Sequence, residues 1–314
     1  MLGLASPAAL RKKGILGMNK RNIQYISQYN SRKNFPLVDD KLKTKIITQK
    51  VGIAVPDMIG TVEYQYEIKE IEKKLEGVTG FVIKPAQGSA GKGILVIVNR
   101  EGDEFIKPNG DRVTFRDIKR HVSNILSGLY SFGGKYDVAM IEALVEFDPV
   151  FDRYSYEGVP DIRVVVYRGF PAMAMLRCST KESDGKANLH QGAVGVGIDL
   201  GTGRAINAVQ HDEPVSIHPD TKFDFSELQI PRWNELLPLA TSCSDITDMG
   251  YLGVDIVLDK NLGPLILELN ARPGLAIQIA NGVGEVPRFD LIDKQSMDLS
   301  VEDRVKFSVE NFSS

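Results

Sequence analysis

One segment near the C-terminal end constrains the fold more than any other part of the sequence. Leu252–Gly274 reads LGVDIVLDKNLGPLILELNARPG, two apolar runs separated by Lys260–Gly263. Such runs around a glycine-containing turn are typical of a β-hairpin. If these four residues form the loop, the facing pairs are Asp259 with Pro264, Leu258 with Leu265, Ile256 with Leu267 and Val254 with Leu269. One face is then wholly apolar, which predicts a buried antiparallel hairpin.

The same register places two carboxylates opposite each other on the second face. Asp255 faces Glu268, and Asn270 lies two residues further along. Directly opposed like charges cost about 0.2 to 1 kcal/mol on a sheet, so the pair favours a bound cation. Oxygen donors of this kind suit Mg²⁺, with Mn²⁺ as a possible substitute. We therefore predict a metal site at Asp255, Glu268 and Asn270, with a solvated acidic surface as the alternative.

The composition favours a soluble protein of one large or two moderate cores. The 314 residues are 25% charged and 43% hydrophobic, and the net charge of −3 gives no reason to expect a nucleic acid partner. No apolar run approaches the roughly 18 to 20 residues that span a bilayer. The basic N-terminal stretch is not followed by an apolar segment, so we expect a surface helix there and no signal peptide. Cys178 and Cys243 are expected to be reduced thiols of a cytoplasmic protein.

A glycine-rich run indicates phosphate binding. Lys84–Ile94 reads KPAQGSAGKGI and lies between two apolar runs, so a strand from Val78 to Pro85 is expected to lead into a loop. Backbone N–H groups exposed by glycines, together with the Lys84 ammonium, are typical of a phosphate cradle. The run differs from a Walker loop because Lys92 is followed by Gly93 and a second strand. The alternative is a mobile connection with an ordinary exposed lysine.

The remaining pattern mixes strands and helices without regular βαβ alternation, which predicts α+β lobes. Helices are expected from about Lys41 to Lys50, with Asp39 or Asp40 as N-cap, and around Trp233–Met249. Asn109-Gly110 predicts a hairpin turn. Further expected elements are an amphipathic helix through Ile118, Val122, Ile125, Leu126 and Leu129, strands at Val138–Val145, Ile162–Tyr167 and Ala172–Arg177, and a polar loop at Lys181–Gln191.

The order of these motifs resembles that of the ATP-grasp ligases. The carrying segments, from Lys41 to Gly274, are DKLKTK, IKPAQGSAGKGI, IE, DIR, NLHQG, GVDIVLD and LELNARPG. The chain is most similar to RimK-like, alpha-L-glutamate ligase-like proteins, and D-alanine:D-alanine ligases share the more generic parts. The resemblance implies an ATP-grasp fold, in which two α+β lobes grip ATP. A helical or extended segment would span 1–40, the lobe with the glycine loop 41–145, and the lobe with the Mg²⁺ site 146–314.

The resemblance also implies roles for the nucleotide-binding residues. Lys41 and Lys84 would touch the ATP phosphates, and the loop carrying Gly88, Ser89, Gly91 and Gly93 would close over them. Glu142 and Val145 match the strand that holds adenine and ribose. Glu146 and Asp148 remain alternatives for the ribose contact.

Basic and polar residues match positions around the triphosphate and the activated carboxylate. They are Arg163, Arg177, Asn188, His190 and Arg272. For Arg163 and Arg177 the alternative is an ordinary salt bridge, and for His190 it is a plain surface position.

The function implied by the resemblance is an ATP-dependent carboxylate–amine ligase. It would join a small-molecule or peptide carboxylate, with glutamate or another amino acid as a candidate, to an amine through an acyl phosphate, releasing ADP and phosphate. The alternatives are an ATP-grasp kinase and a non-catalytic nucleotide-binding protein. Only about forty residues precede Lys41, where most such ligases carry a substrate-binding domain. We therefore expect one of two arrangements. Either the two lobes, the insert Gly102–Gly134 and the tail after Pro273 form the acceptor site, or another subunit, including a second copy in a homo-oligomer, supplies part of it.

Overall fold

The computed structural model describes residues 6–88 and 91–313, which form two compact units. The first unit contains the segment that ends at Asp39, Ile47–Ala54, and the chain from Phe147 onward. The second contains Asp40–Ile46 and Val55–Glu146. The N-terminal segment therefore groups with the C-terminal part of the chain.

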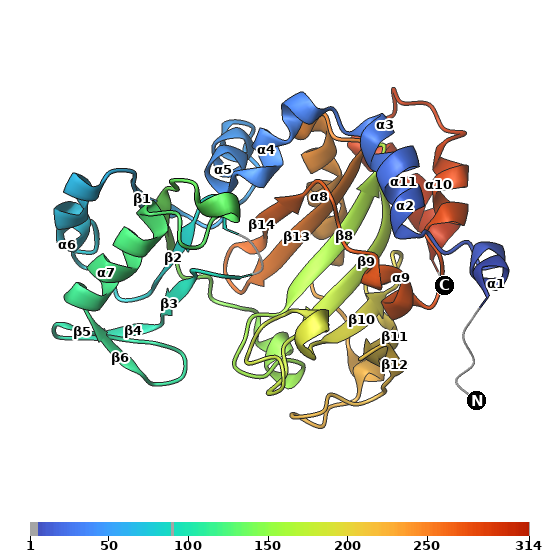
Figure 1. Ribbon diagram of the computed structural model, residues 1–314. Coiled ribbons are helices and arrows are strands. Elements are labelled where there is room, and N and C mark those ends of the chain that lie inside the picture. The colour runs from blue at the N-terminus through green and yellow to red at the C-terminus, as the bar shows by residue number, and fades with distance from the viewer. Residues whose placement is uncertain (1–5, 89–90, 314) are drawn as a thin grey trace. The chain divides into compact units, whose positions relative to one another are not determined.

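A seven-stranded antiparallel sheet forms the centre of the first unit (Figure 1). Its strand order is β12-β11-β10-β9-β8-β13-β14. The strands are β8 (Asp161–Tyr167), β9 (Phe170–Cys178), β10 (Val194–Ile198), β11 (Ala205–Gln210), β12 (Glu213–Pro214), β13 (Tyr251–Asp259) and β14 (Gly263–Asn270). The expected α+β class is confirmed. The sequence analysis did not identify β10 to β12, because glycine and alanine in these segments weaken the strand pattern.

The β13–β14 hairpin confirms the predicted register at its open end and corrects it near the turn. Asp255 pairs with Glu268 as expected, and Val254 pairs with Leu269. The register shifts after Asp255, so that Leu258 faces Pro264 and Ile256 faces Ile266, where the sequence had predicted Leu265 and Leu267.

A tighter turn explains this difference. Asp259 pairs with Gly263, and its Oδ1 accepts hydrogen bonds from the N–H groups of Asn261 and Leu262 at 2.8 and 2.9 Å. This Asx-type turn is one residue shorter than predicted. A β-bulge then leaves Leu267 without a directly paired residue on β13, which restores the predicted register at the carboxylates.

Helices pack on this sheet and on each other. Helix α8 (Trp233–Thr247) contacts β8, β9, β13 and β14, and α11 (Val301–Phe312) contacts α8 and β9. Helix α9 (Ala276–Asn281) lies over β9, β10 and β11. A Cβ atom at Gly197 would lie 2.4 Å from the Ala280 carbonyl oxygen, so only glycine allows this close approach. Helix α10 spans Val286–Ile292.

The N-terminal segment is joined to this sheet by specific side-chain bonds. The Asn30 amide accepts from the Tyr251 N–H at 2.8 Å and donates to the Tyr251 carbonyl at 2.7 Å. In the same way, the Gln278 amide bonds both backbone groups of Leu16. The segment comprises α1 (Pro7–Lys12), α2 (Met18–Lys20), the π-helix η1 (Arg21–Ile26), α3 (Ser27–Tyr29), η2 (Arg32–Asn34) and α4 (Pro36–Asp39).

The second unit holds a four-stranded sheet and a small three-stranded sheet. The first has the order β1 (Met58–Val62), β7 (Ala139–Ala143), β2 (Phe81–Pro85), β3 (Leu95–Ile97), and the second consists of β4 (Asn99–Glu101), β5 (Glu104–Ile106) and β6 (Arg112–Thr114). The predicted Asn109-Gly110 turn joins β5 to β6. Helix α5 (Lys41–Lys50) begins where expected, and Asp40 caps it by accepting from the Leu42 and Lys43 N–H groups.

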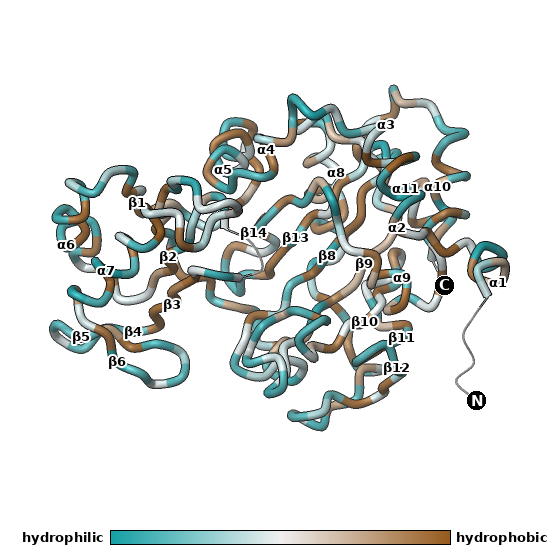
Figure 2. The backbone as a smooth tube through the Cα atoms, viewed as in Figure 1, coloured by the Kyte–Doolittle hydropathy of each residue, from teal (hydrophilic) through white to brown (hydrophobic). Residues whose placement is uncertain are grey.

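Helix α7 (Phe115–Leu126) confirms the predicted amphipathic helix. Ile118, Val122, Ile125 and Leu126 are buried in the core of the second unit, whereas Leu129 lies beyond the helix and is exposed. Figure 2 shows α7 with alternating apolar and polar segments. The other short helices are η3 (Gln65–Glu70), α6 (Ile71–Lys74), η4 (Phe132–Gly134), η5 (Pro149–Arg153), η6 (Leu189–Gln191) and η7 (Phe225–Glu227).

Cys178 and Cys243 are both buried and form no disulfide. In the described parts of the chain, no helix has the length and apolarity required to cross a membrane.

Glu285 is a buried acid next to the docked N-terminal segment. Its side chain is 0% exposed, and the Tyr251 hydroxyl is the polar group beside it. Burial raises the pKa of Glu285 to about 8, although Arg21, the Tyr251 hydroxyl and Arg288 oppose this shift. The folded chain therefore holds a proton on this carboxyl at neutral pH.

We expect the free energy of unfolding to fall as the pH rises from about 4.5 toward about 8. In that range the folded chain keeps the Glu285 proton and the unfolded chain has lost it, so deprotonation favours unfolding. Denaturant titrations of Glu285→Gln and the unchanged chain at pH 5, 6, 7 and 8 measure this effect. The stability of the variant relative to the unchanged chain should rise with pH. The exposed Glu310→Gln is the control, and a pH-independent difference for Glu285→Gln would contradict the assignment.

Candidate active site

A row of charged side chains crosses one face of the sheet in the first unit. Arg163 on β8 is the direct cross-strand partner of Asp255 on β13, which in turn pairs with Glu268 on β14. On the other side, Arg177 on β9 pairs with Asp161. Because side chains alternate along a strand, these five residues share one face. We call them the charged row.

Short bonds connect the members of the charged row. Arg163 binds both oxygens of Asp255, through Nε to Oδ1 and through Nη2 to Oδ2 at 2.5 Å. Arg177 donates to Asp255 Oδ2 at 2.9 Å and to Asp161 Oδ1 at 2.5 Å. Asp255 is 4% exposed, and Asp161 and Arg163 are each 8% exposed. Guanidinium groups suit this arrangement because they form bidentate bonds with carboxylates.

The two buried acids of the row have opposite pKa shifts. Burial alone would raise the pKa of Asp255, but Arg163 and Arg177 outweigh it and lower the pKa to about 2. Burial raises the pKa of Asp161 to about 6, with Arg177 opposing and Asp255 adding to the shift. Asp255 is thus firmly ionised and holds both arginines in place.

The predicted metal ligands meet at the end of this row. Asn270 Nδ2 donates to Asp255 Oδ2 at 3.3 Å, and the half-buried Glu268 faces Asp255 across the strands. Carboxylate and amide oxygens fit Mg²⁺ by chemistry. However, Arg163 and Arg177 already bind the Asp255 oxygens. The metal site therefore stays a prediction, and Glu268 is its most accessible carboxylate.

Asp161 was not among the predicted site residues, although it is the first residue of the DIR segment. Its position two residues before Arg163 on a strand was the available signal, because such residues share a face.

The remaining predicted residues, Asn188, His190 and Arg272, make contacts with nearby groups outside the charged row. The Asn188 side chain accepts from the His190 N–H at 3.1 Å and so caps the short η6 turn. His190 itself is exposed. Arg272 pairs with Asp39 at 2.9 Å and stacks on Phe35, with 4.8 Å between the guanidinium carbon and the ring centre. These three predicted residues lie outside the bonded charged row.

The second unit contains a buried cluster of two lysines and one acid. Glu142 on β7 binds Lys84 at 2.7 Å through one carboxylate oxygen and Lys45 through the other. All three residues are at most 5% exposed. Burial would raise the pKa of Glu142, but the two lysines outweigh it and lower the pKa. With both lysines charged, the cluster carries a net charge of +1, which favours an anion nearby.

Lys45 was missed by the sequence analysis. Lys41 and Lys45 are four residues apart on α5 and therefore lie on the same face of the helix, which was the available signal.

The glycine loop is anchored on both sides. The Asp137 carboxylate accepts from the Gln87 N–H at 3.0 Å and from Ser131 Oγ at 2.6 Å. At the other end His121 Nε2 donates to the Gly93 carbonyl at 3.0 Å. Gly93 has φ +76° and lies against the Tyr130 ring, where a Cβ atom would be 2.5 Å from the ring carbon. Both ends of the loop are thus held in place, and at Gly93 only glycine fits.

Other predicted nucleotide residues lie on or near this loop. Lys41 donates to the Gly88 carbonyl at 2.8 Å. Gly91 has φ +72° and open space where a side chain would begin. Ser89 lies outside the described residues. Val145 is half-buried and follows β7, and its nucleotide contact stays a prediction, as does that of Glu142.

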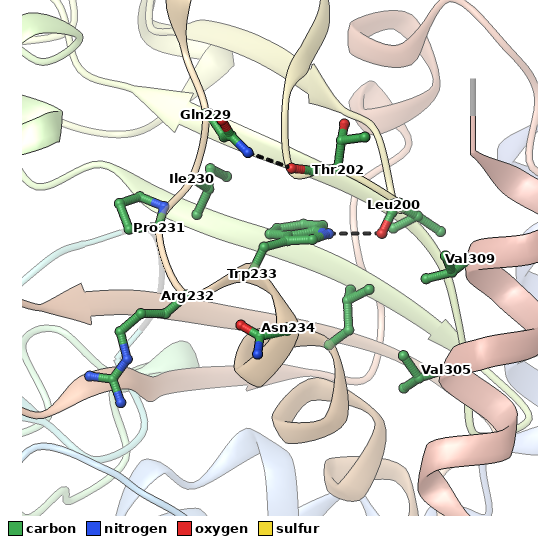
Figure 3. A pocket seen from close by; sticks show the side chains of 12 residues that line it. Leu200, Thr202, Gln229, Ile230, Pro231, Arg232, Trp233, Asn234, Val305 and Val309 are labelled. Atoms are coloured by element: carbon green, nitrogen blue, oxygen red, sulfur yellow. Dashed lines mark hydrogen bonds between the residues drawn. The ribbon is translucent and has the colours of Figure 1, made fainter.

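A separate hollow of about 640 Å³ in the first unit is lined by none of the predicted site residues. Figure 3 shows Trp233 at its centre, with the indole N–H donating to the Leu200 carbonyl at 2.8 Å. We do not assign this Trp233 hollow to the active site.

Residues 20–294 match the family described as sugar-transfer associated ATP-grasp. The chain belongs to this ATP-grasp family. The expected ATP-grasp fold is thereby confirmed, and the matched span includes the glycine loop and the charged row.

Named relatives of this ATP-grasp chain are distant. A probable alpha-L-glutamate ligase of Thioalkalivibrio sulfidiphilus (strain HL-EbGR7) is 22% identical over 245 residues, or 78% of this chain and 59% of that protein. Tubulin polyglutamylase TTLL7 of Mus musculus is 25% identical over 233 residues, or 67% of this chain and 24% of that protein. The chain thus spans less than two thirds of either relative.

Among solved structures, a D-alanine–D-alanine ligase from Bacillus anthracis is similar. It is 13% identical with a TM-score of 0.46, and the match covers 88% of this chain and 70% of that one.

We expect Asp255 and Glu268 to differ sharply in their effect on stability. Asp255→Asn leaves buried guanidinium groups without their carboxylate and should lower the free energy of unfolding by about 3 to 5 kcal/mol. Glu268→Gln changes a half-buried group and should cost less than about 1 kcal/mol. Urea titrations of both variants measure the difference. Equal losses would show that Asp255 is not the group that holds the row together.

Proposed function

We propose that this ATP-grasp protein is an ATP- and Mg²⁺-dependent ligase that activates a carboxylate as an acyl phosphate and joins it to an amine. The observation that carries the proposal is the charged row. Asp255 binds both arginines on this sheet, Asp161 also binds Arg177, and the more accessible Glu268 lies opposite Asp255. Such a set suits binding of phosphate and carboxylate oxygens.

The names of the relatives support this reaction class. One is called a probable alpha-L-glutamate ligase and the other a tubulin polyglutamylase. Both names describe the joining of glutamate, a reaction between a carboxylate and an amine. Because the chain spans only part of each relative, the identity of the acid and the amine here is itself a proposal.

In this proposal the second unit serves the phosphates of ATP. The lysines of the Lys45–Glu142–Lys84 cluster are oriented by Glu142, so little side-chain entropy is lost when an anion binds. Lys41 and the glycine loop add N–H donors, since the backbone at Gly91 is not covered by a side chain. The net positive charge of the cluster offsets part of the phosphate charge.

The first unit serves the acid substrate and the transferred phosphoryl group. Arg163 and Arg177 bind and orient oxygens of the substrate carboxylate, which attacks the γ-phosphorus as ADP leaves. The amine nitrogen then attacks the acyl carbon, phosphate leaves, and the nitrogen loses a proton. Mg²⁺ held by Glu268, Asp255 and Asn270 would supply additional charge neutralisation at the phosphates. Asp255 keeps both arginines in position throughout.

Lys84→Ala should weaken ATP binding by about tenfold or more, because charge-assisted contacts are worth about 1.5 to 3 kcal/mol. Titration with ATP and Mg²⁺ in a calorimeter measures the change. Lys119→Ala, which removes a lysine from an exposed pair with Glu72, is the matched control and should bind ATP normally. Equal affinity of both variants would reduce Lys84 to a structural partner of Glu142.

Hydroxylamine should intercept the activated acid. With ATP, Mg²⁺ and the correct carboxylate, added hydroxylamine should give a hydroxamate together with ADP, and ¹⁸O from the labelled carboxylate should appear in phosphate. A screen of amino acids and dipeptides for stimulated phosphate release identifies the acid.

Glu268→Gln is the control for this assay, because it should keep the fold and lose hydroxamate formation. A stable phosphorylated product without an amine would indicate a kinase. AMP and pyrophosphate would indicate an acyl adenylate and contradict the proposed mechanism.

A further inference from the structure

A second cavity, of about 670 Å³, lies in the first unit. Four segments form its walls: the N-terminal stretch from Ile15 to Arg21, the region of the η6 turn, the end of β11, and the start of α9. This volume lies within the range of about 300 to 1,000 Å³ that is typical of small-molecule sites. We call it the N-terminal cavity because the N-terminal stretch closes one side.

Arg21 and Pro273 lie between this cavity and Arg163. A Cβ atom at Gly253 would lie 2.7 Å from Pro273 and 3.4 Å from Arg163, so both side chains lie against the same glycine. The Pro273 carbonyl accepts from Arg21 Nη1 at 2.8 Å, and Arg21 lines the cavity. Arg21 is therefore separated from Arg163 by Pro273.

A second set of contacts connects the cavity to Arg177. Gly195 on β10 is the direct cross-strand partner of Arg177. The Leu189 side chain covers Gly195, with 2.7 Å from its Cδ2 to the position of a Cβ atom there, and Leu189 lines the cavity. Leu189 thus lies between the cavity and the strand partner of Arg177.

The lining of the cavity is apolar in its interior and polar at two places. Leu16, Ala193 and Val209 are buried, and Ile15, Leu189, Leu275 and Ala276 are half-buried. His190, His211 and Asp212 lie on its exposed rim. The other polar place is Arg21. Its guanidinium donates to the Pro273 carbonyl and to the Asn22 side chain, and these bonds do not use all of its N–H groups.

From this arrangement we infer that the N-terminal cavity binds the acid substrate, and that this substrate is a carboxylic acid with an apolar body. The carboxylate binds the Arg21 guanidinium, and the apolar body fills the cavity. The N-terminal stretch, which the sequence analysis did not assign to the site, forms part of the substrate pocket. That the bound acid is a substrate rests on the proposed ligase function. Binding of the acid to the cavity can be measured without ATP.

Ligand-observed NMR titration of the full chain with acetate, butanoate, hexanoate and octanoate, in the absence of nucleotide, tests this inference. Each methylene that becomes buried should tighten binding by about fourfold, which corresponds to about 0.8 kcal/mol. Hexanamide should bind about tenfold or more weakly than hexanoate, because it is neutral and cannot form an ion pair with Arg21.

Two variants test separately the carboxylate contact at Arg21 and the apolar part of the cavity. Arg21→Gln should remove the preference for the acid over the amide, and Ala276→Phe should remove the dependence on chain length by filling the cavity. Val309→Phe is the matched control, since it fills the Trp233 hollow of similar volume and should bind the acids normally.

The results also separate this inference from the proposed function. Failure of the unchanged chain to bind longer acids more tightly, or an unchanged chain-length dependence in Ala276→Phe, would overturn the cavity assignment. If the acids bind as expected but no acid and amine release ADP, the ligase proposal fails while the cavity stands. If short polar acids are ligated and neither Arg21→Gln nor Ala276→Phe changes their turnover, the ligase stands and the cavity assignment fails.

Discussion

The bidentate bond between Arg163 and Asp255 is the interaction on which the active face of this sheet depends. Two guanidinium groups and two carboxylates lie on strands whose other residues are almost all apolar, so their charges are shielded from water. Isolated, each charge would be very unfavourable there. Together they form a network in which Asp255 serves both arginines, and any anion that approaches meets groups already oriented.

In the second unit, buried lysines are likewise held by a carboxylate. Glu142 binds Lys45 and Lys84 at the same time, one through each carboxylate oxygen. Arginine in the first unit offers a planar fork for bidentate partners, whereas lysine in the second offers a compact point charge. The difference agrees with oriented oxygen binding in one unit and general charge neutralisation in the other.

The sequence alone predicted the parts of the site that depend on local pattern. The opposition of Asp255 and Glu268 followed from counting residues outward from a turn, and the start of α5 followed from its Asp40 cap. The roles of Asp161 and Lys45 were missed although each shares a strand or helix face with a predicted residue. The docking of the N-terminal segment could not be predicted, because it rests on Asn30 and Gln278 bonding backbone groups more than two hundred residues away.

The bulge at Leu267 makes the pairing at the carboxylate end of the β13–β14 hairpin independent of the length of its turn. A four-residue turn without a bulge and the observed shorter turn with one both place Asp255 opposite Glu268. The turn contains one residue fewer than predicted, and the bulge at Leu267 adds one unpaired residue to β14. The two changes cancel, so Asp255 and Glu268 still face each other. The turn at Lys260–Leu262 can therefore diverge in length between related chains without disturbing the carboxylate pair, provided that the bulge appears or disappears with it.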